Sequence, residues 1–99
     1  MSHLLTLLEA VKEDSLTKTQ LENYHTQLSG LYADLMVQIA DLKKEKALFE
    51  AADPNLSVAK SKVLWKASER GQRLIQLEGY ARATSTQLKS LRNRLYATY

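Results

Sequence analysis

The stretch that decides the fold is residues 17–51, TKTQLENYHTQLSGLYADLMVQIADLKKEKALFEA. A large apolar residue recurs in it at every seventh position without a gap, at Leu21, Leu28, Leu35, Leu42 and Phe49. Such a strict repeat is typical of a helix that packs along another helix. Thr17 and Gln20 have the spacing of a capping box, which satisfies free N–H groups where a helix starts. The stretch therefore predicts one long helix over residues 17–51.

Two further helices are predicted, one on each side of this stretch. Residues 3–13 read as a short helix whose apolar side carries four leucines and Val11. Residues 53–55, Asp-Pro-Asn, break the pattern, and proline is well tolerated as the first residue of a helix. A second long helix is therefore predicted over 54–97, with Asp53 as its cap. Its own seven-residue repeat consists of Ala67, Leu74, Ala81, Leu88 and Leu95.

The short connection between the two long helices indicates how they pack. Helices joined by so few residues fold back on each other. The predicted fold class is all-α: a long antiparallel, coiled-coil-like helical hairpin preceded by a short N-terminal helix, in one domain, residues 1–99. Several apolar residues lie off both repeats: Met36, Val37, Leu48, Leu64, Trp65 and Ile75. Because a lone hairpin would leave them in water, we expect a homo-oligomer. The alternative is a monomeric three-helix bundle in which residues 3–13 fill the groove.

The composition excludes several classes of protein. The 99 residues include no cysteine, so disulfides and cysteine-based zinc sites are excluded. No apolar run approaches the roughly 18 residues of a membrane-spanning helix. The first residues lack the basic region and the cleavage site of a signal peptide. We therefore expect a cytoplasmic protein that does not contact a membrane, located in the host cytoplasm if a phage encodes it.

The sequence contains no motif for catalysis. Its two histidines, His3 and His25, lack partners at a convincing metal-binding spacing, apart from the weak pair of Glu22 with His25. The three glycines are isolated inside predicted helices, so no glycine-rich phosphate loop is present. The chain is therefore predicted not to be an enzyme and to use no cofactor and no metal.

Charge is divided unevenly along the chain. Residues 1–53 carry five lysines and nine acidic residues, a net charge of −4, whereas residues 54–99 carry nine basic and two acidic residues, a net charge of +7. This asymmetry predicts an anionic partner. Cations in rows along a helix can follow a phosphate backbone. The residues predicted to bind nucleic acid are Lys62, Lys66, Arg70, Arg73, Arg82, Lys89, Arg92 and Arg94.

Aromatic residues lie among these cations and add a second feature of nucleic-acid binding. Trp65 and Tyr96 could stack on the bases of a single strand. In the alternative interpretation Trp65 packs in the core, and the cations pair with acidic residues on one face of the first long helix. Those acidic residues are Asp34, Asp41 and Glu45.

Several segments resemble a known family. Residues 12–15 (KEDS), 31–35 (LYADL), 42–46 (LKKEK) and 89–96 (KSLRNRLY) are similar to corresponding segments of phage recombination mediators of the UvsY type. Residues 57–73 look instead like small uncharacterised phage proteins. The resemblance implies a ring-like homo-oligomer that binds single-stranded DNA and helps a recombinase to replace a single-strand binding protein. It adds three residues to the expected DNA contacts: Lys43, Lys44 and Lys46.

Two functions from different classes follow. The first is a non-enzymatic, oligomeric helical protein that binds single-stranded nucleic acid through its basic second helix, as a phage recombination mediator or accessory protein. The alternative is a phage-type protein–protein interaction module: an inhibitor of a host defence complex, a sponge for a nucleotide signal, or an assembly chaperone. Two basic rows that merge across subunits into one continuous stripe favour the first function, and rows buried against the acidic face of the first long helix favour the second.

Overall fold

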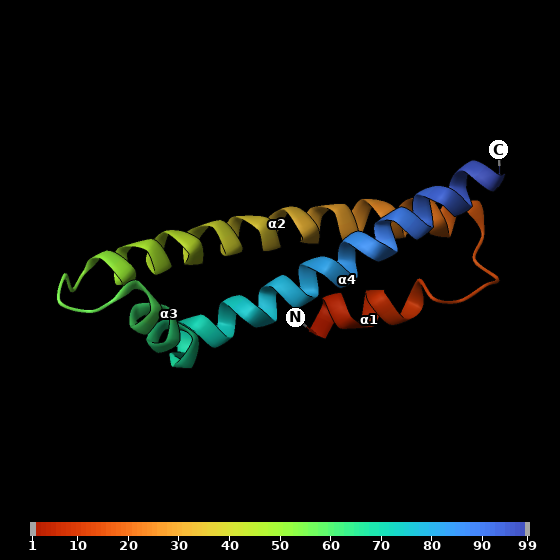
Figure 1. Ribbon diagram of the computed structural model, residues 1–99. Helices are drawn as coiled ribbons and strands as arrows, with labels where there is room; N and C mark the ends of the chain where they lie inside the picture. The colour runs from red at the N-terminus through yellow and green to blue at the C-terminus, as the bar shows by residue number, and fades with distance from the viewer. Residues whose placement is uncertain (1, 99) are drawn as a thin grey trace. The chain divides into compact units, whose positions relative to one another are not determined.

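A computed structural model describes residues 2–98, and this part of the chain contains helices and no strand. The four helices are α1 (Ser2–Ala10), α2 (Lys18–Ala51), α3 (Val58–Ala67) and α4 (Glu69–Thr98) (Figure 1). The predicted all-α class is therefore confirmed. None of these helices is long and apolar enough to cross a membrane.

The start of α2 agrees with the sequence. The Thr17 N–H donates to Gln20 Oε1 at 2.9 Å, and the Gln20 N–H donates to Thr17 Oγ1 at 3.2 Å. This reciprocal pair is the predicted capping box. Leu21, Leu28 and Leu35 of the apolar repeat are buried. The predicted helix over 17–51 is confirmed, with Thr17 as its cap.

The start of the second half differs from the prediction. The Asn55 N–H donates to Asp53 Oδ1 at 2.9 Å, and the Leu56 N–H donates to the Asp53 carbonyl at 3.2 Å. The Asp53 side chain therefore closes a turn through Pro54 and does not cap a helix that begins at 54. The cap of α3 is Ser57, whose Oγ accepts a hydrogen bond from the Lys60 N–H at 3.2 Å.

A single helix over 54–97 is also wrong, because Ser68 interrupts it. Ser68 has extended backbone angles, φ −75° and ψ 160°. Its N–H and its Oγ–H both donate to the Trp65 carbonyl, at 3.0 and 2.5 Å. The same Oγ accepts from the Gly71 N–H at 3.0 Å. Ser68 thus ends α3 and caps α4 at once, which satisfies backbone groups that a helix break leaves free.

Gly71 permits the close approach of α3 and α4 at this corner. A Cβ atom built on Gly71 would lie 1.8 Å from the Trp65 carbonyl oxygen and 2.7 Å from its carbonyl carbon. Two backbones cannot meet this closely if a side chain stands between them. Nothing lies within 4 Å of the corresponding position at Gly30 or Gly79. Only Gly71 of the three is therefore needed for a close backbone contact.

The chain divides into two compact units. One comprises the described residues up to Asp34 together with those from Ala81 onward, and the other comprises Leu35–Tyr80. Both α2 and α4 contribute residues to each unit. The single domain expected over 1–99 and the full-length antiparallel pairing of two long helices stay predictions.

In the first unit, α1 packs through buried leucines and a basic side chain holds its end. Leu4, Leu7 and Leu8 of α1 are buried, and Leu28 and Leu91 are fully buried. The Arg94 guanidinium donates to the carbonyls of Val11 and Glu13, at 2.7 and 2.5 Å. The predicted helix over 3–13 is too long at its C-terminal end, since α1 ends at Ala10 and residues 11–12 form a turn.

In the second unit, the core forms around the only tryptophan of the sequence. Trp65 is 2% exposed, and its ring centroid lies 5.7 Å from that of Phe49, with an interplanar angle of 55°. This tilted geometry is favourable for aromatic pairs. Leu35, Ile39, Leu74 and Leu77 are also buried. This core fixes the corner between α3 and α4.

Candidate functional site

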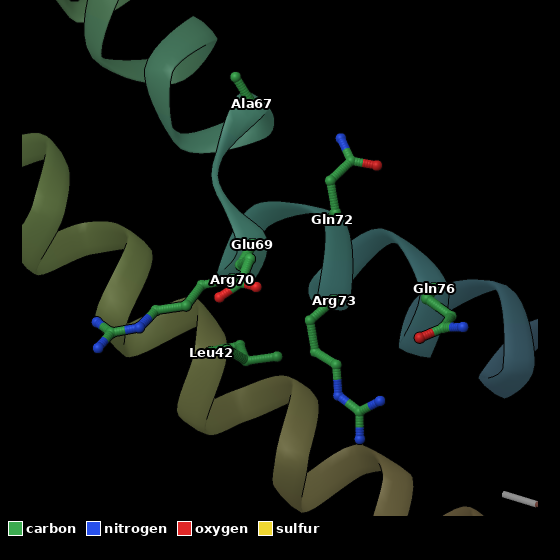
Figure 2. A pocket seen from close by; sticks show the side chains of 7 residues that line it. All are labelled: Leu42, Ala67, Glu69, Arg70, Gln72, Arg73 and Gln76. Atoms are coloured by element: carbon green, nitrogen blue, oxygen red, sulfur yellow. The ribbon is translucent and has the colours of Figure 1, made fainter.

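The corner at Ser68 forms one side of an open groove in the second unit. The groove has a volume of about 700 Å³. Its lining combines polar and basic side chains of α4 with two apolar residues, one from α2 and one from α3. The lining residues are Leu42, Ala67, Glu69, Arg70, Gln72, Arg73 and Gln76 (Figure 2).

Two arginines give the groove its chemistry. Arg70 and Arg73 both extend from α4 toward α2, and Leu42 of α2 lies between them in Figure 2. Arg70 Nε lies 3.9 Å from Glu45 Oε2, and both side chains are in contact with solvent, since Arg70 is 69% and Glu45 44% exposed. A long ion pair in water contributes little to stability, so Arg70 remains able to bind another anion. Guanidinium groups bind phosphate and carboxylate with two hydrogen bonds each.

Two glutamines are held on the α4 side of the groove. The Gln72 Nε2–H donates to the Lys66 carbonyl at 2.6 Å, which joins α4 to the end of α3. The Gln76 Nε2–H donates to the Tyr80 hydroxyl at 3.3 Å, one helical turn further along α4. These contacts order the wall beside Arg73. No pattern in the sequence singles out either glutamine, because the contacts depend on the corner at Ser68.

The other predicted cations of this unit are exposed. Lys62 and Lys66 lie on α3, whereas Arg70 and Arg73 lie on α4, so the break at Ser68 divides these four cations between two helices. Within residues 2–98, Lys62, Lys66 and Arg73 form no ion pair with an acidic side chain. Their charges are therefore available to an external anion.

The predicted cations of the first unit divide into two groups. Arg82, Lys89 and Arg92 are exposed on α4 and form no ion pair in the described part of the chain. Arg94 differs, because both of its terminal nitrogens donate to backbone carbonyls beside α1. Arg94 therefore has a structural role within the first unit, and its expected role in binding nucleic acid stays a prediction.

The acidic face of α2 does not neutralise the cations. Asp34 and Asp41 are exposed and form no ion pair within residues 2–98, and Glu45 reaches only Arg70. Lys43 and Lys44 are exposed, and Lys46 is half-buried. In the alternative interpretation the cations pair with this acidic face. Among the described residues, only the contact of Arg70 with Glu45 agrees with it.

The aromatic residues are placed differently from the expectation. Trp65 is buried against Phe49, so it cannot offer a ring face to a base, and its expected contact with nucleic acid is corrected. Tyr96 is 70% exposed on α4. Tyr99, which lies near the predicted cations in sequence, falls outside the described residues.

Among the described residues, no three His, Cys, Asp or Glu side chains gather as a metal site would require. Comparisons with protein-family models, curated proteins and solved structures give no match to this chain.

Proposed function

We propose that this chain binds single-stranded nucleic acid through its phosphate groups, at the corner between α3 and α4. The observation that supports the proposal is the set of exposed cations there: Lys62, Lys66 and Arg73 without acidic partners, and Arg70 with one long contact. An open groove suits a flexible backbone better than an enclosed pocket would. Sequence-independent binding follows, because phosphate contacts carry no base information.

The site has no preformed stacking surface around a tryptophan, so charge has to supply most of the affinity. Four phosphate contacts give a slope of about −3 when log affinity is plotted against log salt concentration, since a single strand contributes about 0.7 per contact. The resemblance to UvsY-type proteins makes phage recombination the proposed setting. In that setting the protein acts as a non-enzymatic accessory to a recombinase in the host cytoplasm.

The test is the anisotropy of a labelled oligothymidylate titrated with the protein at several salt concentrations. The triple variant Lys62→Glu, Lys66→Glu, Arg73→Glu is expected to lose binding. The matched control is Arg82→Glu, Lys89→Glu, Arg92→Glu, which changes the net charge equally but in the first unit. The proposed site predicts that the control retains most of the affinity. An equal loss of affinity in both variants would show that binding is not localised at this site. Unchanged affinity in the first variant would show that these three cations do not bind the strand.

A protein partner is the second candidate function, favoured by a different surface. An apolar hollow of about 540 Å³ lies along α3, where Val63 is 66% exposed and Leu64 is 48% exposed. Such a surface suits a protein–protein interaction module, whether a defence inhibitor or an assembly chaperone. In this case Val63→Asp abolishes capture of a host protein, whereas the triple variant at Lys62, Lys66 and Arg73 leaves the capture unchanged.

A further inference from the structure

The solvent face of α2 carries an apolar and charged stripe within the second unit. Val37 and Leu48 are 62% and 72% exposed, which is high for aliphatic residues of a long helix. Asp41 and Lys44 are exposed between them. The spacings of four, three and four residues place all four side chains on one side of the helix. We call Val37, Asp41, Lys44 and Leu48 the outer stripe.

The order of residues along the outer stripe is self-complementary. The midpoint of positions 37 and 48 in the sequence lies between Leu42 and Lys43. The midpoint of positions 41 and 44 lies at the same place. When α2 of a second copy lies antiparallel to the first and the two midpoints coincide, Val37 of each copy faces Leu48 of the other. Asp41 of each copy then faces Lys44 of the other. This is the pattern of a twofold interface, in which residue i meets j and j meets i. A parallel pair would instead set aspartate against aspartate and lysine against lysine.

Two further observations favour this occupant. Asp41 and Lys44 form no ion pair within residues 2–98, so both charges remain for a partner chain. Ala40 precedes Asp41 and Ala47 precedes Leu48, and both alanines are exposed. Such small side chains beside the outer stripe leave room for the backbone of a second helix. We propose that a second copy of this chain docks antiparallel on the outer stripe.

This inference does not rest on the proposed function. The outer stripe shares no residue with the groove that holds Arg70 and Arg73. Because the stripe covers only about three helical turns, its interface is smaller than a standard one, and we expect a dimer that dissociates on dilution.

Sedimentation equilibrium tests the charge pairing. The wild-type protein is expected to move with concentration from its chain mass of 11.2 kDa toward twice that mass. Asp41→Lys and Lys44→Asp are each expected to remain monomeric, because each sets like charges together. The double variant Asp41→Lys, Lys44→Asp restores the opposite charges and is expected to dimerise again. Circular dichroism checks that every variant keeps its helices.

The outcomes that overturn the inference are distinct. A wild-type protein that is monomeric at all concentrations, or single variants that dimerise as well as the wild type, would exclude this interface. A double variant that stays monomeric with intact helices would exclude the Asp41–Lys44 pairing.

Disulfide formation tests the direction of the pair. The chain has no cysteine of its own, so any disulfide formed by a single-cysteine variant involves the introduced cysteine. Mild oxidation of a mixture of Val37→Cys and Leu48→Cys chains is expected to give the mixed disulfide. Neither variant alone is expected to give a dimer, because positions 37 and 37 of antiparallel copies lie about 16 Å apart along the helices, too far for a disulfide. Efficient self-linking of each variant alone would show a parallel pair and overturn the inference.

Discussion

At the scale of single residues, Gly71 is the position where a small change has the largest expected effect on stability. Gly71→Ala puts a Cβ atom 1.8 Å from the Trp65 carbonyl oxygen, so the corner between α3 and α4 has to open. We expect a loss of about 1–3 kcal/mol in the free energy of unfolding, the usual cost of overpacking. Thermal or urea unfolding followed by circular dichroism measures it.

The other two glycines provide matched controls for this prediction. Gly30 and Gly79 lie within helices and have open space where a Cβ would be. Gly30→Ala and Gly79→Ala are each expected to raise the free energy of unfolding by about 0.5–1 kcal/mol, since alanine is the better helix former. A stabilising Gly71→Ala would show that the two helices do not meet as described.

Arg94 is the second residue with a specific expected effect. Its guanidinium binds two carbonyls just beyond α1, so Arg94→Ala leaves these acceptors without their charged donor. We expect a loss of about 1–2 kcal/mol in unfolding free energy and faster amide hydrogen exchange in α1. Arg94→Lys is expected to recover only part of the loss, because an ammonium group lacks the planar fork of guanidinium. Unchanged exchange in α1 would contradict this role.

Residue roles were the least predictable part of the candidate site. The sequence places Arg94 and Arg92 in one basic cluster, yet only Arg94 contacts residues some eighty positions earlier. Trp65 similarly lies between the exposed residues Leu64 and Lys66, yet its ring is buried and packs against Phe49. Contacts between residues far apart in the chain decide both cases, and no local pattern contains that information.

At the scale of elements, Ser68 has a larger expected contribution than an ordinary helix cap. Ser68→Ala removes the Oγ that bonds both the Trp65 carbonyl and the Gly71 N–H, so the end of α3 and the start of α4 both lose a partner. The control Ser57→Ala removes one exposed bond of 3.2 Å at the start of α3. We expect a loss of about 2 kcal/mol for Ser68→Ala and about 1 kcal/mol or less for Ser57→Ala, measured by urea unfolding. Equal losses would contradict the double role of Ser68.

The helices were predictable to different degrees. The helix over 17–51 could be predicted because its cap and its seven-residue repeat give the same answer. The region 54–97 could not be predicted in full, since apolar residues keep their spacing across Ser68 and hide the break. The retrospective signal is the pair Ser68 and Gly71, a cap with a glycine three residues later.

At the scale of the whole molecule, both long helices pass through both compact units, which predicts joint unfolding. The single tryptophan lies in the second unit, so its fluorescence reports on that unit, whereas circular dichroism reports on all helices. Leu28 is fully buried in the first unit, and Leu28→Ala is expected to cost about 2–5 kcal/mol. We expect this substitution to lower the midpoints of both signals together. A lower dichroism midpoint with unchanged fluorescence would show independent units.

The proposed function depends on the charge pattern of the whole molecule. The excess of cations in residues 54–99 could be counted directly, and most of them are exposed. Their grouping could not be foreseen, because it depends on the helix break at Ser68 and on the use of Arg94 beside α1. The groove itself contains Gln72 and Gln76, which composition and spacing did not distinguish.

The corner at Ser68 and Gly71 also bears on how this chain can change during evolution. Every residue other than glycine adds a Cβ atom, so no single substitution at position 71 preserves the contact with Trp65. The apolar positions of helical repeats, in contrast, accept many exchanges among apolar residues, so sequence similarity between relatives is lost quickly there. A diverged relative is therefore expected to keep three features of this corner: a buried aromatic residue, a serine after it, and a glycine three positions after the serine.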